Sequence, residues 1–436
     1  MSHFEIIEVK ARQVWDSRGC PTVEADVILA GGVTGRAIAP AGASRGTHEA
    51  IDLRDGEAQF GGLGVDRAIA NINGEIADAL KGRDVNDQNG IDDTLIALDG
   101  TDAKMRLGGN AIVAVSMATL HAAARACELP LWQYLAGERP VRIPVPEIQI
   151  FGGGAHAGRR TDIQDYMIMA PHAESFREAL AITAEVYRAA GARMADAGRL
   201  AGVADEGGWW PSFESNEDAL SELVRAIKHA GFRPGEDVWL SLDIAANEFK
   251  RNGRYRLALD GREVESDQMI GLIENWVGRF PILSIEDPLA EDDLEGTSEL
   301  MNRIGDRVQV IGDDLLVTNA NRVAAAVEAK AANALLVKVN QAGTVTEAKQ
   351  ALEAARTAGW GTIVSARSGE TEDVTIAHLA VGWNAGQFKV GSFARSERMA
   401  KWNEVLRIEE ALGSEACFAG DSGLPELVRR QLGNRQ

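Results

Sequence analysis

Three acidic residues end successive short apolar runs in the second half of the chain. Asp243 closes VWLSLD, Glu286 lies near the end of ILSIED, and Asp313 lies near the end of VQVIGDD. Three carboxylates gathered at one place would repel one another unless a cation held them, and oxygen ligands without Cys or His suit Mg²⁺. We therefore predict a magnesium site. For any one of the three, a solvent-exposed loop carboxylate is the alternative interpretation.

Two lysines lie in comparable runs further along the chain. Lys338 interrupts LLVKVN and Lys389 interrupts QFKVG, and a lysine in an apolar strand is rarely fully buried without a partner. Neighbouring ammonium groups lower each other's pKa, and burial acts in the same direction. A neutral Lys338 beside a divalent cation would then remove a proton from carbon. The alternative is that both lysines form structural salt bridges with Asp313 and Asp243.

These residue types favour removal of a proton next to a carboxylate group. The negative charge of the product spreads over two carboxylate oxygens, and bound cations stabilise that charge as it forms. The reaction then needs an acid that protonates a leaving group. Glu206 in VADEGGWWP is our candidate, because Gly207 and Gly208 let the backbone approach closely. Asp165 in IQDYMIM is the carboxyl group that we expect beside it.

The same apolar runs indicate the elements that position these residues. The later runs recur about every 25 residues, and most are followed by an Ala-rich helical stretch, as in an eight-stranded β/α barrel. Continuous apolar strands are typical of a parallel sheet covered by helices, and functional groups gather at the C-terminal ends of barrel strands. We expect strands at 238–243, 282–287, 308–314, 335–340, 362–367 and 387–391.

The first part of the chain has a different pattern. Residues 4–9 and 23–29 alternate apolar and polar side chains at strand period, and Gly31-Gly32 predicts a hairpin turn. Apolar residues at helical spacing follow at 68–80 and 110–126. A group of prolines then interrupts the chain near residue 140. We predict an α+β capping domain over residues 1–138 and a β/α barrel over residues 139–436.

Charge and composition argue against several classes of partner. A formal net charge of −20 over 436 residues disfavours binding to nucleic acid or to an anionic membrane through a general basic field. A local cationic pocket for a small anion remains compatible with this charge. The three cysteines lie far apart without a CxxC pattern, and no apolar run approaches membrane-spanning length. We expect a cytoplasmic protein with no nucleic-acid or membrane partner.

Several longer motifs occur in a fixed order along nearly the whole chain. They are WDSRGCPTVEADV, PAGASRGTHEA, GGNAIVAVSMA, HAGRRTDIQDYMIM, DEGG, LDIAANEF, SIEDP, GDDLLVTN, LLVKVNQAGT, RSGETED and ARSER. In sequence and order they resemble the motifs of the enolase family. The resemblance implies an α/β fold, in which an α+β capping domain with a lid loop precedes a modified (β/α)8 TIM-type barrel. It also implies two Mg²⁺ ions per active site, and a homodimer or higher homo-oligomer.

The resemblance implies a role for each residue of the site. Asp243, Glu286 and Asp313 match the first Mg²⁺ site, and Ser44 in the lid matches a ligand of the second. The remaining catalytic residues are then the base Lys338, the acid Glu206 with its support Asp165, the loop histidine His156, and Lys389, which helps to hold the substrate carboxylate. The substrate-binding residues are Gln164, Ser44, Arg45, Ala366, Arg367 and Ser368, with Arg367 and Ser368 as the phosphate-binding pair.

The chain departs from the family pattern mainly around the substrate. Ala366 stands where the family has a histidine, and Asp165 where it has a glutamate. Smaller residues replace polar ones at Gly152, Ala155 and Ala41. Arg45 replaces a threonine of the lid, and Trp210 and Phe393 are larger than the usual residues.

Because the metal ligands and the base are retained, we expect a specialised enolase paralogue. It would resemble the carboxyphosphonoenolpyruvate synthases of phosphonate natural-product pathways, and its small phosphorylated or phosphonate carboxylate substrate would carry an additional anionic or bulkier group. A divergent enolase that dehydrates 2-phosphoglycerate to phosphoenolpyruvate is the first alternative. A non-catalytic relative with a structural or binding role is the second, and the retained metal ligands and base argue against it.

Overall fold

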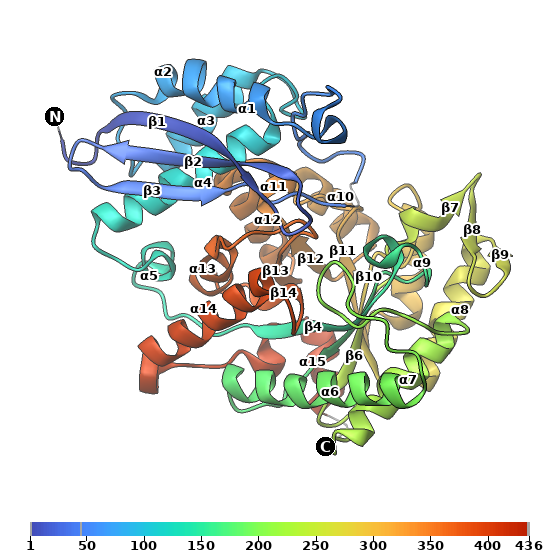
Figure 1. The fold of residues 1–436 in the computed structure, drawn as a ribbon. Helices are drawn as coiled ribbons and strands as arrows, with labels where there is room; N and C mark the ends of the chain where they lie inside the picture. Colours follow the sequence, from blue (N-terminus) through green and yellow to red (C-terminus); the bar gives the residue numbers. More distant parts are fainter. Residues whose placement is uncertain (1, 44–45, 434–436) are drawn as a thin grey trace.

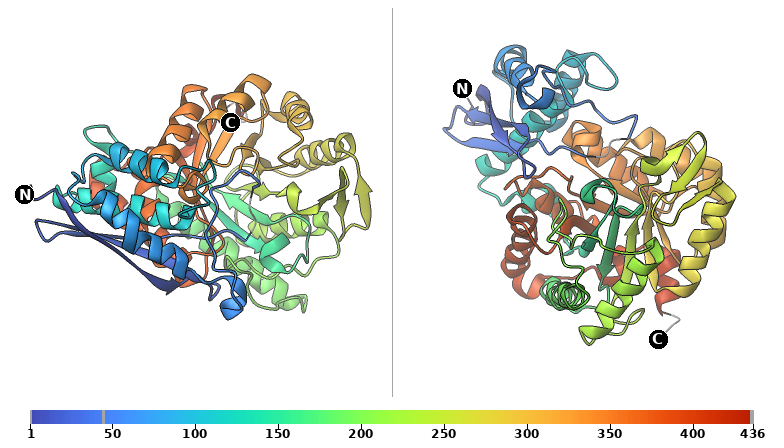
Figure 2. Two further views of the ribbon diagram at one scale, coloured as in Figure 1. Left: turned by 90° about the horizontal axis from the view of Figure 1, so that it is seen from above. Right: turned by 45° about the vertical axis from the view of Figure 1, so that its right-hand side comes forward.

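The computed structural model of the chain describes residues 2–43 and 46–433. An N-terminal α+β domain lies against one side of a closed β/α barrel (Figure 1). Figure 2 shows from two further directions that the N-terminal strands, in blue, stay outside the barrel wall. Among the described residues, no helix combines the length and the apolar character needed to cross a bilayer.

The N-terminal sheet consists of three antiparallel strands, β1 (Ile6–Trp15), β2 (Pro21–Leu29) and β3 (Thr34–Ile38), in that order. The predicted hairpin turn is confirmed, because the backbone N–H of Leu29 donates to the carbonyl oxygen of Val33 across Gly31-Gly32. The helix predicted at 110–126 is α4 (Gly109–Ala126), and it packs on the sheet. A Cβ atom at Gly35 would lie 2.1 Å from a carbonyl oxygen of α4, so glycine permits this close approach.

The segment predicted as a helix at 68–80 is not one regular helix. It consists of α1 (Asp66–Asn71), a π-helical turn η2 (Ile72–Ile76) and α2 (Ala77–Leu80). The backbone leaves helical geometry at Gly74, where φ is −105° and ψ is −107°, and glycine tolerates such angles. The other elements of this domain are η1 (Gln59–Gly62), α3 (Gln88–Asp99) and α5 (Leu131–Ala136).

The barrel closes in the strand order β10-β11-β12-β13-β14-β4-β5-β6. The sequence pattern predicts β6 and β10–β14 within a few residues, but not β4 and β5, which no long helix separates. The strands are β4 (Val145–Gly152), β5 (Asp165–Met169), β6 (Trp239–Asp243), β10 (Ile282–Glu286), β11 (Gln309–Gly312), β12 (Ala334–Val337), β13 (Gly361–Ser365) and β14 (Gly386–Ser392).

The expectation of a fully parallel barrel sheet is wrong for one strand, β5. β5 runs antiparallel to both β4 and β6, because a short connection rather than a crossover helix joins it to β4. Two consecutive helices then return the chain to β6. The reversal places Asp165, the first residue of β5, directly opposite Asp243, the last residue of β6. A residue at the start of β5 therefore faces the same barrel mouth as residues at the ends of the other strands.

Helices surround the barrel, and polar side chains cap several of them. Ser175, Ser215 and Thr344 each accept a hydrogen bond from a backbone N–H in the first turn of the following helix. The helices are α6 (Phe176–Asp196), α7 (Asn216–His229), α8 (Ser266–Arg279), α9 (Leu294–Ile304), α10 (Ala320–Ala329), α11 (Val339–Ala342), α12 (Val345–Thr357), α13 (Thr375–Gly382), α14 (Ser396–Leu412) and α15 (Glu426–Gly433).

Short elements complete the described chain. A small antiparallel sheet follows β6, formed by β7 (Lys250–Arg251), β8 (Arg254–Leu257) and β9 (Arg262–Val264). Single 3₁₀ turns are η3 (Gly154–Ala157), η4 (Ala246–Phe249), η5 (Gly413–Glu415) and η6 (Gly420–Gly423). Of these, η3 belongs to the loop between β4 and β5, which reaches over the barrel mouth and carries His156.

Candidate active site

The three predicted metal ligands lie at neighbouring strand ends of the barrel mouth. Asp243 is the last residue of β6, Glu286 is the last residue of β10, and Asp313 directly follows β11. In the parallel register Glu286 pairs with Asp243, so that these two side chains start from adjacent positions. All three residues are buried. The strand ends thus bring the three acids to the same mouth of the barrel, and their role as metal ligands stays a prediction.

Two lysines neutralise these carboxylates. Lys389 Nζ donates to Asp243 Oδ2 at 2.9 Å and to Glu286 Oε2 at 2.7 Å. Lys338 Nζ donates to Asp313 Oδ2, whose partner oxygen Oδ1 accepts a hydrogen bond from Gln341 Nε2 at 2.8 Å. The salt bridges that we weighed as an alternative are thus present, and they involve the same residues as the proposed chemistry. We call Asp243, Glu286, Asp313, Lys338 and Lys389 the lysine cluster.

The protonation of the two lysines differs from the expectation. Burial lowers the pKa of Lys338, but the carboxylates of Asp313 and Glu286 together outweigh burial and raise the pKa above its ordinary value. Burial also opposes the charge of Lys389, yet Asp243 and Glu286 raise its pKa well above the usual range. Lys389 does lower the pKa of Lys338, as expected, but the neighbouring carboxylates outweigh this effect. Both lysines are therefore charged in this structure.

The donor set of the lysine cluster suits a hard cation. Glu286 is fully buried, and burial, followed by the charge of Asp243, raises its pKa well above the ordinary value. Its Oε1 atom has no hydrogen-bond partner among the described residues, which is unfavourable for a buried carboxylate oxygen unless a ligand binds it. With only oxygen ligands available from the three acids, Mg²⁺ fits this position. The predicted second-site ligand Ser44 lies outside the described residues.

Two sets of residues, neither of them the predicted triad of Asp243, Glu286 and Asp313, bring potential ligand atoms within 4.8 Å of one another. Among the described residues these are His156, Asp165 and Glu206, and a set formed by Asp287, Asp313 and Asp314. In the second set the Asp287 carboxylate accepts hydrogen bonds from the backbone N–H groups of Asp313 and Asp314, which fixes the turn after β11. Asp287 therefore orients Asp313, which we predicted as a metal ligand.

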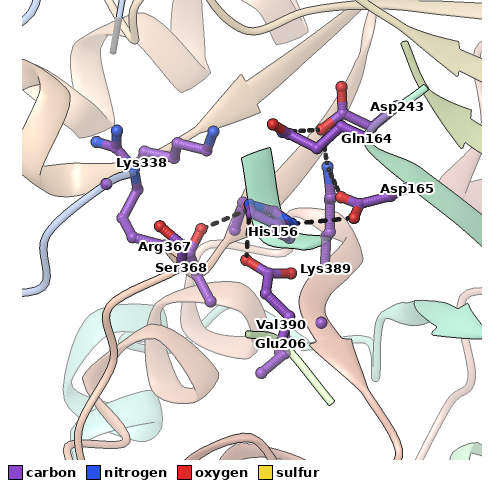
Figure 3. Close-up of a pocket in the computed structure, with 14 residues that line it drawn as sticks. His156, Gln164, Asp165, Glu206, Asp243, Lys338, Arg367, Ser368, Lys389 and Val390 are labelled. Carbon is purple, nitrogen blue, oxygen red and sulfur yellow. Dashed lines mark hydrogen bonds and ion pairs between the residues drawn. The ribbon is translucent and has the colours of Figure 1, made fainter. Parts of the chain in front are cut away.

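His156, Asp165 and Glu206 form a second group at the pocket, which we call the histidine cluster (Figure 3). His156 Nδ1 lies 3.2 Å from Asp165 Oδ1, and its Nε2 lies 3.8 Å from Glu206 Oε1. Burial opposes the charge of His156, but Glu206 and Asp165 raise its pKa to about 9. Burial likewise disfavours the charge of Asp165, yet His156 and then Lys389 hold its pKa well below the usual range. We predicted Asp165 beside Glu206, and the structure places His156 in contact with both.

Asp165 also connects the two clusters. Its Oδ2 atom lies 3.6 Å from Lys389 Nζ, and its Oδ1 atom faces His156. Gln164, the preceding residue, donates from Nε2 to Asp243 Oδ2 at 3.2 Å, and it lines the pocket as a substrate-binding residue should. Gln164 and Asp165, just before and at the start of β5, therefore link the lysine cluster to the histidine cluster.

The predicted phosphate end lies beside these clusters. Arg367 and Ser368 follow β13 and line the same pocket as Lys338 and Glu206. The Arg367 guanidinium contacts both carboxylate oxygens of Glu49, at 3.0 and 3.2 Å. Glu49 belongs to the PAGASRGTHEA motif and was not predicted as a site residue, although an acid beside a glycine-rich lid is a signal for one.

The residues around Ala366 show how this end is held. The backbone N–H of Ala366 donates to the carbonyl oxygen of Lys389 at 2.9 Å, and Ala366 lines the pocket with a side chain that is 7% exposed. Ser368 Oγ accepts a hydrogen bond from the backbone N–H of Ala43 at 2.6 Å, which ties β13 to the start of the lid. The predicted lid residue Arg45 lies outside the described residues.

Two family models match the chain, and together they cover most of it. The model described as "Enolase, N-terminal domain" matches residues 6–135, and the one described as "Enolase, C-terminal TIM barrel domain" matches residues 140–426. A relative named Enolase 1, from Desulfitobacterium hafniense, is 50% identical over 421 residues, which cover 96% of this chain and 96% of the relative. The two matches thus include Glu49 beside the lid and all residues of the lysine cluster and the histidine cluster.

Proposed function

Because this chain belongs to the enolase family, we propose that it dehydrates 2-phosphoglycerate to phosphoenolpyruvate with the help of Mg²⁺. The single observation that carries the proposal is the composition of one pocket. Lys338, Lys389, Glu206, Arg367 and Ser368 all line it, so that a candidate base, a candidate acid and an anion-binding pair face one pocket. The 50% identical relative named Enolase 1 supports the same reaction.

Each group of this chain has a defined task in such a reaction. Lys338 is charged in this structure, and Mg²⁺ bound by Asp313 and Glu286 would counter the carboxylate charges that keep it so, which would leave a neutral amine as the base. Neutral Lys338 accepts the proton from the carbon next to the carboxylate, after which the carbon–oxygen bond to the hydroxyl group breaks and a carbon–carbon double bond forms. Glu206 supplies a proton to the departing hydroxyl group, which leaves as water. Mg²⁺ bound by Asp243, Glu286 and Asp313 would supply positive charge for the substrate carboxylate. Lys389 holds its carboxylate neighbours in place.

The phosphate group of the substrate fits the Arg367 end of the pocket. A guanidinium offers several donors in a plane and matches phosphate oxygens well. Arg367 now pairs with Glu49, so an incoming phosphate shares or replaces that partner. His156, charged beside Asp165 and Glu206, adds a further positive charge to the pocket wall.

The predicted specialisation for a phosphonate substrate gains no support from the comparisons. They favour our alternative interpretation, a divergent enolase, since nothing in them is specific for a phosphonate pathway. The small residue at Ala366 remains the observation that led to the specialised interpretation. The family also favours an oligomer, and sedimentation of the purified protein at several concentrations would test our proposal of a homodimer.

The proposed function is tested by following enolpyruvate absorbance with purified protein, Mg²⁺ and 2-phosphoglycerate. We expect turnover that a chelator abolishes and that added Mg²⁺ restores. Lys338→Ala serves as the inactive control, because it removes the base but leaves the phosphate end intact. Failure of the wild-type protein to produce phosphoenolpyruvate at saturating Mg²⁺ would reject the proposal.

A further inference from the structure

Gln149 on β4 is fully buried next to the histidine cluster. Its side-chain Nε2 donates a hydrogen bond to Asp165 Oδ1, and its Oε1 accepts one from the backbone N–H of Gly208 at 2.9 Å. Its backbone carbonyl oxygen accepts a hydrogen bond from Ser392 Oγ at 2.5 Å. Both the main chain and the side chain of Gln149 are therefore fixed.

These bonds complete a closed ring of contacts, which we call the positioning ring. Gly208 contacts Gln149, Gln149 contacts Asp165, and Asp165 Oδ1 lies 3.2 Å from His156 Nδ1. His156 Nε2 lies 3.8 Å from Glu206 Oε1, and Glu206 is two residues before Gly208 in the same loop. The ring thus begins and ends on the segment that carries the proposed acid.

The carboxamide of Gln149 satisfies both neighbours of this side chain. Asp165 presents a carboxylate, which needs a donor, whereas Gly208 presents an N–H group, which needs an acceptor. A carboxylate at position 149 would set two acceptors against each other, and a hydrocarbon would leave a buried donor and a buried acceptor without partners. Such buried unpaired groups are destabilising. The chemistry of Gln149 therefore matches its two contacts and not only the available volume.

Two glycines leave the space that this side chain occupies. A Cβ atom at Gly208 would lie 2.3 Å from Gln149 Oε1, and a Cβ atom at Gly152 would lie 3.2 Å from it and 2.5 Å from Ala204 Cβ. The strand register places Gly152, and not Gln149, directly opposite Asp165. Gln149 therefore reaches Asp165 diagonally, across the place where a side chain at position 152 would lie.

We propose that Gln149 is a positioning residue, which holds Asp165, and through it His156 and Glu206, in the orientation that proton delivery to the leaving group requires. Gln149 is absent from the described residues that line the pocket, so it acts through Asp165 and the loop of Glu206. The inference rests on the proposed function for its catalytic consequence. Its structural part, the ring itself, can be tested without any substrate.

The main test compares Gln149→Leu with a matched change of another buried barrel glutamine. Gln387, near the start of β14, bonds to Gln309 and to the carbonyl oxygen of Gly423, at the barrel end away from the pocket. For Gln149→Leu we expect kcat with 2-phosphoglycerate to fall about 10- to 100-fold, with KM nearly unchanged. For Gln387→Leu we expect thermal stability to fall but kcat to stay near the wild-type value. Equal kcat values for the two variants would overturn the proposal.

A second variant, Gln149→Glu, keeps the size of the side chain and remains informative if Gln149→Leu does not fold. Its carboxylate still accepts the Gly208 N–H but repels Asp165. One proton shared between the two carboxyl groups restores the hydrogen bond, so the activity of Gln149→Glu relative to wild type should rise as the pH falls. A ratio of activities that stays constant with pH would contradict the proposed role, since a purely structural defect has no reason to recover in acid.

Hydrogen exchange at the Gly208 amide separates this inference from the proposed function. Gln149→Leu removes the acceptor of this N–H, so exchange in residues 204–210 should accelerate, whereas Gln387→Leu should leave it slow. Unchanged protection in Gln149→Leu would reject the ring whatever the substrate is. A wild-type protein with the expected protection but without turnover of 2-phosphoglycerate would reject the proposed function and leave the ring supported.

Discussion

Asp243, Lys338 and Lys389 of the lysine cluster line the same pocket as the histidine cluster, but the two clusters come from different kinds of structure. The lysine cluster takes its five residues from parallel strands, four of them at or directly after a strand end and Lys389 within β14, and pairs of opposite charge hold it together. The histidine cluster takes His156 from a 3₁₀ turn, Asp165 from the reversed strand and Glu206 from a glycine-rich loop. The barrel alone therefore positions the first cluster, whereas the second depends on a few individual hydrogen bonds.

The largest effect should follow from changing the base of the lysine cluster. Lys338→Ala removes the group that accepts the proton, and general-base catalysis typically contributes about 10²- to 10⁴-fold to the rate. We expect kcat to fall by that order, together with exchange of the substrate α-hydrogen with solvent, measured by NMR in deuterium oxide. Lys104→Ala is the matched control, because Lys104 is also buried and paired, with Glu347, but outside the pocket. Full α-hydrogen exchange in Lys338→Ala would show that the base lies elsewhere.

The two clusters also differ in how far the sequence predicts them. The lysine cluster follows from a simple rule, because charged residues that end apolar runs meet at one mouth once the strands are parallel. The reversal of β5 does not follow from that rule, since its five residues are as apolar and as buried as those of the parallel strands. Asp165 was therefore placed in the site by its motif and not by its position at a strand end.

The sequence analysis did not predict two residues, Gln149 and Glu49, that contact site residues through a single long side chain. Gln149 lies in an apolar strand without a pattern that distinguishes it from other buried residues, and the only signal for Glu49 is its position beside the glycine-rich lid. Their roles arise from contacts between segments far apart in the chain, such as Glu49 with Arg367. The raised pKa values of the lysines were missed for the same reason, because they depend on which charge lies nearest in space.

His156 should contribute strongly to the stability of the histidine cluster, and in a way that depends on pH. Its pKa is about 9 in the folded protein and about 6.5 in an unfolded chain. The stabilisation is therefore fully present below pH 6.5 and is lost as the pH rises through 9, with a total on the order of 3 kcal/mol. Urea unfolding of wild type and His156→Gln at pH 6, 7.5 and 9.5 should show a difference that shrinks steadily. A difference independent of pH would mean that His156 is uncharged in the folded state.

A smaller effect is expected when one charge of the lysine cluster is removed without a change in size. Glu286→Gln leaves the barrel packing intact but weakens the oxygen donor set, so we expect the Mg²⁺ concentration for half-maximal activity to rise about 10- to 100-fold. Calorimetric titration with Mg²⁺ provides a readout that does not depend on turnover. Asp292→Asn, which removes an exposed acid paired with Lys250, is the control and should leave Mg²⁺ binding unchanged. Equal Mg²⁺ affinity in Glu286→Gln and wild type would place the ion outside this cluster.

The smallest effect should arise at Ala366, where the pocket lacks the histidine found in the family pattern. Its backbone N–H bonds to the carbonyl oxygen of Lys389, and Arg367 follows it, so a ring at position 366 would lie between the lysine cluster and the phosphate end. Ala366→His adds a donor for a substrate oxygen, and we expect kcat/KM for 2-phosphoglycerate to rise by up to about tenfold. Ala366→Phe adds similar bulk without a donor, and it should lower kcat/KM because the pocket is narrowed. If the two variants changed kcat/KM alike, bulk alone would account for the effect, and position 366 would play no part in recognising the phosphate group.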